Sequence, residues 1–339
     1  RGRNPGIPNK KMIKNKKIIP ITTNERKVLF LRKEIELLLD NIRTGKDSRL
    51  KKRRNKSYVS GMFIPKTYIE SSEGKDAAHR IVAQIDENNL PDDYERIILA
   101  EYALKLMVSR GLVSHDINPE SSLLYDFIRD NKSFGCYAIL IDDVIADIKK
   151  IEQKIRRLKS VLLIQLDYIE EQDFLGFLYM SLQCLGGRKA AGVYYTPLSV
   201  VKDAIDSLGS INSGAKLLDP CCGTGNFLMY SYKCIPNLEQ LYGFDVDSLS
   251  VCLTRLNMAI ETKTQDIELL YKNFVCKDTL ISDERMNYDI VIGNPPWGFK
   301  YSEEEQKKLK TIYLSAQTKT VESFCVFTEY ALKAISQNG

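Results

Sequence analysis

The residues with the most specific chemistry form the run Asp289-Ile290-Val291-Ile292-Gly293-Asn294-Pro295-Pro296-Trp297. Two prolines cannot continue a central strand, because neither donates a ladder hydrogen bond, and their fixed φ angles make a stiff loop. That loop can direct the Asn294 side-chain oxygen and a proline carbonyl, both acceptors, toward a planar NH2 group. Trp297, the only tryptophan, would offer a flat face for stacking. The alternative is a core tryptophan after a turn.

A glycine loop follows an expected strand over Lys216–Asp219. Its sequence is Asp219-Pro220-Cys221-Cys222-Gly223-Thr224-Gly225-Asn226-Phe227. Glycines are needed where a backbone turns tightly and touches a ligand without an intervening Cβ. A dinucleotide fingerprint requires a third glycine, and position 228 is Leu. The loop therefore favours a smaller nucleoside ligand over a dinucleotide.

Two acidic residues stand at the ends of the next expected strands. Asp245, followed by Val246, ends the strand Leu241–Asp245 and comes 20 residues after Gly225, where such folds hold a ribose diol. Asp278 follows the strand expected over Tyr271–Cys276 and can accept a hydrogen bond from an adenine amino group. For each, an ordinary exposed carboxylate at a strand end is the alternative.

Together with Gly192-Val193-Tyr194-Tyr195-Thr196-Pro197, these motifs resemble gamma-class amino-directed DNA methyltransferases. Phe174–Leu178 adds a likeness to type I modification subunits and to type IIS or IIG adenine methyltransferases. The resemblance implies transfer of a methyl group from S-adenosylmethionine to the exocyclic N6 of adenine within a restriction-modification system. N6 is favoured over cytosine N4 on family likeness only.

The same resemblance assigns roles to individual residues. Asp245 would be the ribose ligand and Asp278 the adenine ligand. The expected cofactor-binding set is Tyr195, Thr196, Pro197, Asp219, Pro220, Gly223, Gly225, Asn226, Phe227, Asp245, Val246 and Asp278. The expected catalytic loop is Asn294, Pro295, Pro296 and Trp297. Two departures from the family pattern are Cys221-Cys222, where Ala-Cys is frequent, and Trp297, where Tyr or Phe is commoner.

Other functions remain open at this stage. A protein-glutamine N5 methyltransferase also uses an Asn-Pro-Pro-aromatic loop, because an amide NH2 is planar too. A subunit that binds the cofactor without catalysing transfer is a third possibility. The Tyr-Tyr-Thr-Pro segment and the basic N-terminal region favour DNA as the substrate.

The elements expected to position these motifs form a parallel sheet. Strand-like runs at Lys216–Asp219, Leu241–Asp245, Tyr271–Cys276 and Tyr288–Gly293 alternate with helical patterns, which predicts an α/β, Rossmann-like methyltransferase domain over 186–339. Asn294 follows Asp219 by only 75 residues, so no target-recognition domain is inserted there. We expect the chain to be part of a longer protein that supplies the remaining C-terminal strands. Target recognition would come from a C-terminal domain or a separate specificity subunit.

An α-helical domain is predicted over 67–185. Within it, Ile141, Ile148, Ile155, Leu162 and Ile169 recur every seven residues, which predicts one long helix over 138–169 packed within its own domain. An intermolecular coiled coil is the alternative. Asp147-Ile148-Lys149 matches half of a metal-dependent nuclease signature, but it lies on an expected helix, whereas cleavage sites favour a strand.

Charge separates the N-terminal region from the rest of the chain. Residues 1–66 hold 20 Lys and Arg against 5 Asp and Glu, whereas the remaining residues hold 29 against 39. We expect an amphipathic helix over 24–43, opened by the Thr22 and Glu25 capping box. The run Lys51, Lys52, Arg53 and Arg54 is expected to contact phosphates of double-stranded DNA. A solvated tail is the alternative.

Composition narrows the class of protein further. Hydrophobic residues make up 44% and charged residues 27%, which excludes a collagen-like or largely disordered chain, and no apolar run is long enough to span a membrane. The eight cysteines include no C-x-x-C pair and lie away from both histidines, so we expect no metal site. Free thiols favour a reducing, cytoplasmic location.

Overall fold

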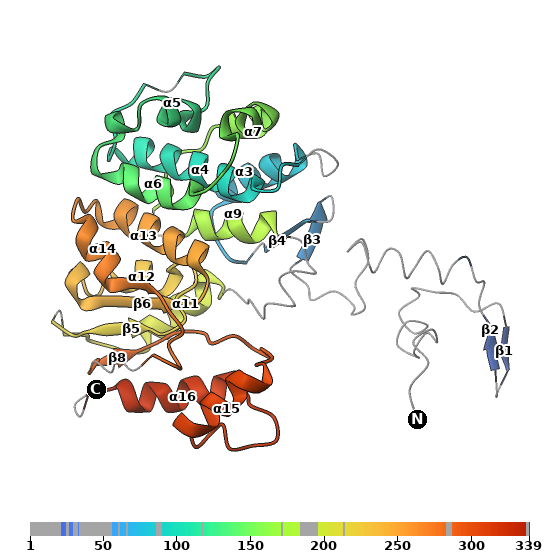
Figure 1. Ribbon diagram of the computed structural model, residues 1–339, viewed down its shortest axis with the longest axis vertical. Coiled ribbons are helices and arrows are strands. Elements are labelled where there is room, and N and C mark those ends of the chain that lie inside the picture. The colour runs from blue at the N-terminus through green and yellow to red at the C-terminus, as the bar shows by residue number, and fades with distance from the viewer. Residues whose placement is uncertain are drawn as a thin grey trace.

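The structure is a computed structural model. It describes residues 22–24, 27–29, 33, 56–59, 62–65, 67–85, 90–116, 118–170, 172–183, 196–212, 214–282, 287–336 and 339. Figure 1 shows a helical unit and a parallel sheet with helices on both faces. This α/β architecture confirms the predicted fold class. The boundary predicted at residues 185 and 186 lies outside the described residues and stays a prediction.

Four parallel strands form the sheet in the order β7-β6-β5-β8. They are β5 (Leu217–Asp219), β6 (Leu241–Asp245), β7 (Phe274–Cys276) and β8 (Ile290–Val291). Each was predicted, but β7 and β8 are shorter than expected. Residues 271–273 end the helix α14 (Ile267–Asn273), and Tyr288 forms an isolated parallel bridge with Ile335. Because parallel strands run the same way, their carboxyl ends share one edge.

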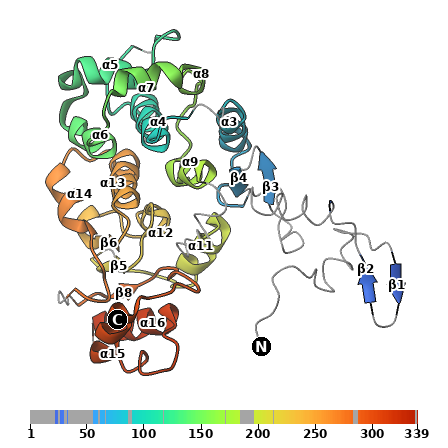
Figure 2. The same cartoon turned by 45° about the vertical axis from the view of Figure 1, so that its right-hand side comes forward.

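Side chains alternate between the two faces of the sheet. Leu217 and Leu241 belong to the core on one face, whereas Leu218 and Tyr242 face the second core, as a period of two requires. In Figure 2, α12 (Asn226–Ser231), α13 (Ser248–Thr262) and α14 lie above the sheet, and α15 (Glu303–Ile312) and α16 (Ser323–Ala334) lie below it. The helix α11 (Leu198–Asp206) packs against α12.

The helical unit rests on α13 through α4, α6 and α9. Its elements are α3 (Ser72–Ala83), α4 (Tyr94–Arg110), α5 (Leu123–Arg129), the 3-10 helix η1 (Asn131–Tyr137), α6 (Ala138–Ile145), α7 (Ile151–Arg157), α8 (Lys159–Leu162) and α9 (Phe174–Leu182). A second 3-10 helix, η2 (Leu238–Gln240), precedes β6. Gly111 ends α4 in the left-handed region, at φ 78°, as a C-terminal glycine does.

The long helix predicted over 138–169 is wrong. The segment forms the three short helices α6, α7 and α8, because Asp147 and Lys150 adopt φ of 63° and 54°, which an α-helix does not allow. The heptad residues Ile141, Ile155 and Leu162 are nevertheless buried, in a core that the helical unit shares with one face of the sheet. The repeat therefore reports burial within the chain, not a continuous helix.

The prediction of an amphipathic helix over 24–43 is wrong for its first residues. The strands β1 (Thr22–Asn24) and β2 (Lys27–Leu29) pair antiparallel there, and β-branched residues such as Thr22, Thr23 and Val28 fit strands better than helices. Except for Lys33, which is helical, residues 30–43 lie outside the described residues, as do Lys51–Arg54. A second hairpin, β3 (Lys56–Val59) with β4 (Met62–Pro65), precedes the helical unit.

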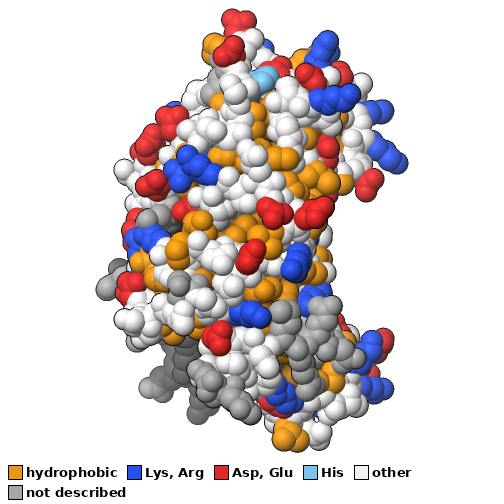
Figure 3. Space-filling model, turned by 90° about the vertical axis from the view of Figure 1, so that its left-hand side faces the viewer, with side chains coloured by type: hydrophobic (Ala, Val, Ile, Leu, Met, Phe, Trp, Pro, Cys, Tyr) orange, Lys and Arg blue, Asp and Glu red, His pale blue; other side chains and the backbone are white. Residues whose placement is uncertain are grey.

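Two further observations concern the surface. None of the described helices is long and apolar enough to cross a membrane. On the face shown in Figure 3, acidic and basic side chains are interspersed among apolar ones. The strong basic bias therefore belongs to residues 1–66.

Candidate cofactor and catalytic site

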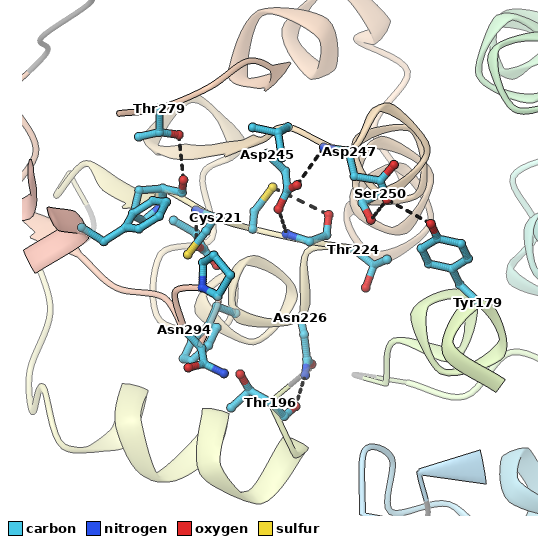
Figure 4. A pocket seen from close by; sticks show the side chains of 18 of the residues that line it. Tyr179, Thr196, Cys221, Thr224, Asn226, Asp245, Asp247, Ser250, Thr279 and Asn294 are labelled. Carbon is cyan, nitrogen blue, oxygen red and sulfur yellow. Dashed lines mark hydrogen bonds between the residues drawn. The ribbon is translucent and has the colours of Figure 1, made fainter. Parts of the chain in front are cut away.

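A cavity of about 640 Å³ opens where the loops after the parallel strands meet. This is the edge where open α/β sheets bind ligands, and the volume suits a small-molecule site. The predicted residues among its lining are Thr196, Asp219, Pro220, Gly223, Asn226, Phe227, Asp245, Val246, Asp278, Asn294 and Pro296. Figure 4 shows these loops converging from separate elements. Motifs far apart in sequence thus form one site.

The glycine loop turns from β5 into α12. Gly223 and Gly225 adopt φ of 55° and 90°, in the left-handed region that favours glycine. A Cβ at Gly225 would also lie 3.1 Å from the Thr254 side chain. Asn226 follows and donates from Nδ2 to the Thr196 carbonyl at 3.0 Å. That bond joins the loop to the segment before α11, and Gly225 shapes the turn without lining the cavity.

Asp219, which is buried, and Asp245, which is partly buried, are acids at the ends of β5 and β6. Asp219 Oδ1 accepts from the Cys221 N–H at 3.1 Å, and burial, assisted by the Asp245 charge, raises the pKa of Asp219 to about 7. Asp245 accepts from the N–H groups of Gly223 and Asp247, both at 2.9 Å. Burial raises the pKa of Asp245 although these bonds oppose it. A carboxylate offers about four acceptor positions, so Asp245 can still accept from ligand hydroxyls.

Asp278 and its neighbour Thr279 form the wall beyond β7. Asp278 Oδ1 accepts from the Leu280 N–H at 3.0 Å, and burial raises the pKa of Asp278. Thr279 donates to the Pro220 carbonyl at 2.7 Å, which ties this wall to the glycine loop. The two predicted ligand segments therefore hold each other in place.

The loop after β8 carries the expected catalytic residues. Asn294 and Pro296 line the cavity, whereas Pro295 and Trp297 are not among its lining. Trp297 Nε1 donates to Asn294 Oδ1 at 2.8 Å. The indole is 54% exposed and stacks on Phe324, with ring centroids 5.5 Å apart. The Pro296 carbonyl accepts from Ser323 Oγ, so α16 supports the loop.

Some lining residues were missed by sequence reasoning. Asp247 accepts from Tyr179 Oη at 3.0 Å and from Ser250 Oγ at 2.6 Å, and Tyr68 also lines the cavity. Asp247 could have been found, because it caps α13 two residues after Asp245. Tyr68 lies just before α3, and Tyr179 lies in α9 of the helical unit. Sequence motifs of the sheet domain do not predict how the helical unit packs against it.

The remaining predicted residues lie elsewhere. Pro197 is the N-cap of α11 and does not line the cavity. Tyr195 and the run Lys51–Arg54 lie outside the described residues. Asp147, of the nuclease-like motif, lies between α6 and α7 and is exposed.

Two adjacent cysteines, Cys221 and Cys222, line the cavity. Burial raises the pKa of both Cys221 and Cys222 well above the usual value, so these thiols stay protonated and unreactive near neutral pH. Among the described residues, no group of three or more His, Cys, Asp or Glu side chains could hold a metal ion.

Residues 171–339 match the model of a family described as N-6 DNA Methylase. The type II methyltransferase M.VspI of Vibrio sp. (strain 343) is 23% identical over 262 residues, which cover 73% of this chain and 62% of that protein. The type I restriction enzyme EcoEI methylase subunit of Escherichia coli is 23% identical over 183 residues, 50% of this chain and 36% of that protein. The chain thus spans less than two thirds of these relatives.

The chain is also similar to a solved structure. The methyltransferase subunit of a type I restriction-modification system from Streptococcus thermophilus superposes with a TM-score of 0.47 at 17% identity. The match covers 79% of this chain and 72% of that one.

Proposed function

We propose that this chain, whose residues 171–339 belong to the N-6 DNA methylase family, transfers a methyl group from S-adenosylmethionine to the N6 amino group of adenine in double-stranded DNA. The observation that carries the proposal is a single cavity that brings Asn294 of the Asn-Pro-Pro-Trp loop beside Asp219, Asp245 and Asp278. The name of one relative, the type I restriction enzyme EcoEI methylase subunit, supports a restriction-modification setting, and we propose that setting here.

The residues of the cavity fit S-adenosylmethionine. Gly223 and Gly225 adopt positive φ and let the backbone turn under a ligand. Asp245 would hold the ribose hydroxyls and Asp278 the adenine amino group. Carboxylates of Glu95, Asp219, Asp245, Asp247 and Asp278 line the cavity together with Lys277, which suits a ligand that carries a positively charged sulfonium and an ammonium group. When bound, the cofactor supplies an electrophilic methyl group.

Asn294 would prepare the nitrogen that receives the methyl group. An exocyclic amine is a poor nucleophile because its lone pair is delocalised into the ring. Hydrogen bonds from its two hydrogens to Asn294 Oδ1 and to the Pro295 carbonyl would favour a pyramidal nitrogen with an available lone pair. Correct positioning then supplies much of the rate, so this mechanism requires no strong base.

The target base must leave the helix to reach this loop. Its extrusion costs a few kcal/mol, and stacking on an aromatic ring returns roughly 1–3 kcal/mol. Trp297, exposed beside the cavity, is the ring that we assign to this role. Sequence specificity would come from a specificity subunit or from a target-recognition domain outside the described residues.

Identification of the methylated atom tests the proposal. The full-length protein, with any specificity partner, is incubated with labelled S-adenosylmethionine and duplex DNA, and the digested nucleosides are analysed by mass spectrometry. We expect N6-methyldeoxyadenosine. Label on cytosine N4 would overturn the adenine assignment, and label on a release-factor-like protein in a parallel reaction would support the glutamine alternative. Cofactor binding without transfer would identify a non-catalytic subunit.

The basic run Lys51–Arg54 is proposed to contact DNA phosphates. Replacing all four side chains by alanine should weaken DNA binding and reduce the slope of log K against log salt by about 3–4. A matched control removes four exposed cations of the helical unit, Lys149, Arg156, Arg157 and Lys159. Equal losses in both variants would show a general effect of net charge instead of a specific contact.

A further inference from the structure

A buried carboxylate outside the cavity lies beneath the glycine loop. Asp173, the N-cap of α9, is only 1% exposed and does not line the cavity. Its Oδ1 accepts from the Gly176 N–H at 2.6 Å and from Asn257 Nδ2 at 2.7 Å. Its Oδ2 accepts from Tyr68 Oη at 2.5 Å and from Thr224 Oγ1. Four donors thus occupy the acceptor positions of one carboxylate.

Thr224 is held from both ends by this arrangement. Its hydroxyl donates to Asp173, and its carbonyl accepts from Asn257 Nδ2 at 2.8 Å. Asn257 in turn donates to Asp173, so the three residues form a closed ring of hydrogen bonds. Thr224 stands between Gly223 and Gly225, the two positive-φ positions of the loop. Glycines leave the backbone free to adopt many conformations, so the ring supplies the restraint that they lack.

The restraint extends to the expected ribose ligand. Gly223, next to Thr224, donates its N–H to Asp245 Oδ2 at 2.9 Å. A shift of Thr224 therefore moves the donor that orients Asp245. Asp173 does not line the cavity and acts on Asp245 through the loop that it holds.

Tyr68 connects the start of α11 to this ring of hydrogen bonds. Besides its bond to Asp173, its backbone carbonyl accepts from the Leu198 N–H at 3.2 Å, at the start of α11 just after Thr196 and Pro197. Tyr68 also lines the cavity. Tyr68 therefore contacts both segments expected to enclose the cofactor, and it lies directly beyond the basic region 1–66.

The packing around Gly176 shows how closely α9 approaches the loop. A Cβ built on Gly176 would overlap Asp173 Oδ2 and Thr224 Oγ1. Only glycine fits there, because any larger side chain would separate the helix from the loop. The ring of hydrogen bonds thus requires direct docking of the helical unit.

We propose that Asp173 and Tyr68 are positioning residues that hold Thr224 and thereby fix the glycine loop in its cofactor-binding conformation. The inference rests on the proposed function for the identity of the ligand. It assigns to the helical unit a role in cofactor affinity in addition to its structural role.

The test compares two buried carboxyl groups. Asp173→Asn keeps the shape of the side chain but removes its charge and one acceptor atom. Glu101→Gln does the same at a carboxylate within the helical unit, which accepts from the N–H groups of Leu123 and Leu124 at 3.2 and 2.8 Å. Both variants should melt at lower temperatures. Only Asp173→Asn should raise Kd and KM for S-adenosylmethionine, by about tenfold or more, with kcat at saturating cofactor within about threefold of the wild-type value.

Milder variants keep the test informative if Asp173→Asn fails to fold. Tyr68→Phe should weaken cofactor binding about threefold to tenfold. Thr224→Val should weaken it as well, whereas Thr224→Ser, which retains the hydroxyl, should restore it. Equal cofactor affinity in Thr224→Val and Thr224→Ser, or unchanged affinity in both Asp173→Asn and Tyr68→Phe, would overturn the proposal.

Hydrogen exchange separates this inference from the proposed function. Without cofactor, peptides covering residues 219–228 should exchange faster in Asp173→Asn and Tyr68→Phe than in the wild type and in Glu101→Gln. If the wild type binds no S-adenosylmethionine, the proposed function fails, but the exchange data still test whether Asp173 and Tyr68 hold the glycine loop. If the wild type binds it and the exchange rates do not differ, the inference fails alone.

Discussion

The helical unit and the carboxyl edge of the sheet bury acidic side chains in different surroundings. In the helical unit, Glu101 accepts from two backbone N–H groups and faces the Lys105 ammonium at 3.3 Å. At the sheet edge, Asp219 lies near Asp245, whose charge helps to raise its pKa. A buried acid with a cation beside it completes a core, whereas a buried acid near a second, partly buried acid costs folding energy and fits a site prepared for a ligand.

The largest effect is expected at the sheet edge, where replacing Asn294 should slow methyl transfer. Asn294→Ala should lower methyl transfer about 10²–10³-fold, by analogy with other lost polar stabilisers of a transition state. Cofactor affinity should stay the same, because we assign Asn294 to the target amine. Single-turnover assays and calorimetry on the full-length protein measure the two quantities. Near-normal transfer would remove Asn294 from the mechanism.

Replacing Asp245 should change the affinity for the cofactor and not the rate of methyl transfer. Asp245→Ala should weaken cofactor binding about 10–100-fold, since hydrogen bonds to a charged group are worth about 1.5–3 kcal/mol and the Gly223 N–H also loses its acceptor. Isothermal titration calorimetry measures the change. Asp143→Asn is a suitable control, because Asp143 pairs with Tyr271 and Arg255 away from the cavity. Unchanged affinity in Asp245→Ala would remove the ribose assignment.

The core of the helical unit around Ile141, away from Asp173 and Tyr68, should respond in stability alone. Ile141 is fully buried, and Ile141→Ala should lower the free energy of unfolding by about 2–5 kcal/mol. The neighbouring Ile139 is 50% exposed, and Ile139→Ala should cost less than about 1 kcal/mol. Denaturant titration gives both values. A change in cofactor affinity of folded Ile141→Ala would show that the core around Ile141 also acts on the cofactor site, in addition to Asp173 and Tyr68.

Replacing Asp219 should give the smallest change, a difference in melting temperature that depends on pH. The carboxyl has a pKa near 3.8 when unfolded and about 7 when folded, so the folded state retains a proton that the unfolded state loses. Stability should therefore fall as pH rises from about 4 to about 7. Asp219→Asn removes this loss, and its melting temperature should exceed that of the wild type at pH 8 by about 5 °C. Near pH 4 the difference should shrink, and a constant difference across this range would contradict the assignment.

The two regions also differ in what their sequences predict. Gly225 and Asp245 act within a few residues of the strands that carry them, so the motif reveals both element and position. Ile141, Ile155 and Leu162 predict only that their faces are buried, because the breaks at Asp147 and Lys150 depend on how short helices pack. The contact of Tyr68 with Asp173 spans 105 residues, and the contact of Asp173 with Thr224 arises from docking of the helical unit on the sheet domain. No local pattern contains that information.

The loop after β8 also supplies an optical reporter. Trp297 is the only tryptophan in the chain, and its indole is bonded to Asn294 and stacked on Phe324. The intrinsic tryptophan emission of these 339 residues therefore arises at one position beside the cavity. Any event that separates the indole from Asn294 or Phe324, or stacks a base against it, changes the surroundings of that single fluorophore. Occupation of the loop can thus be followed in real time without attaching a dye.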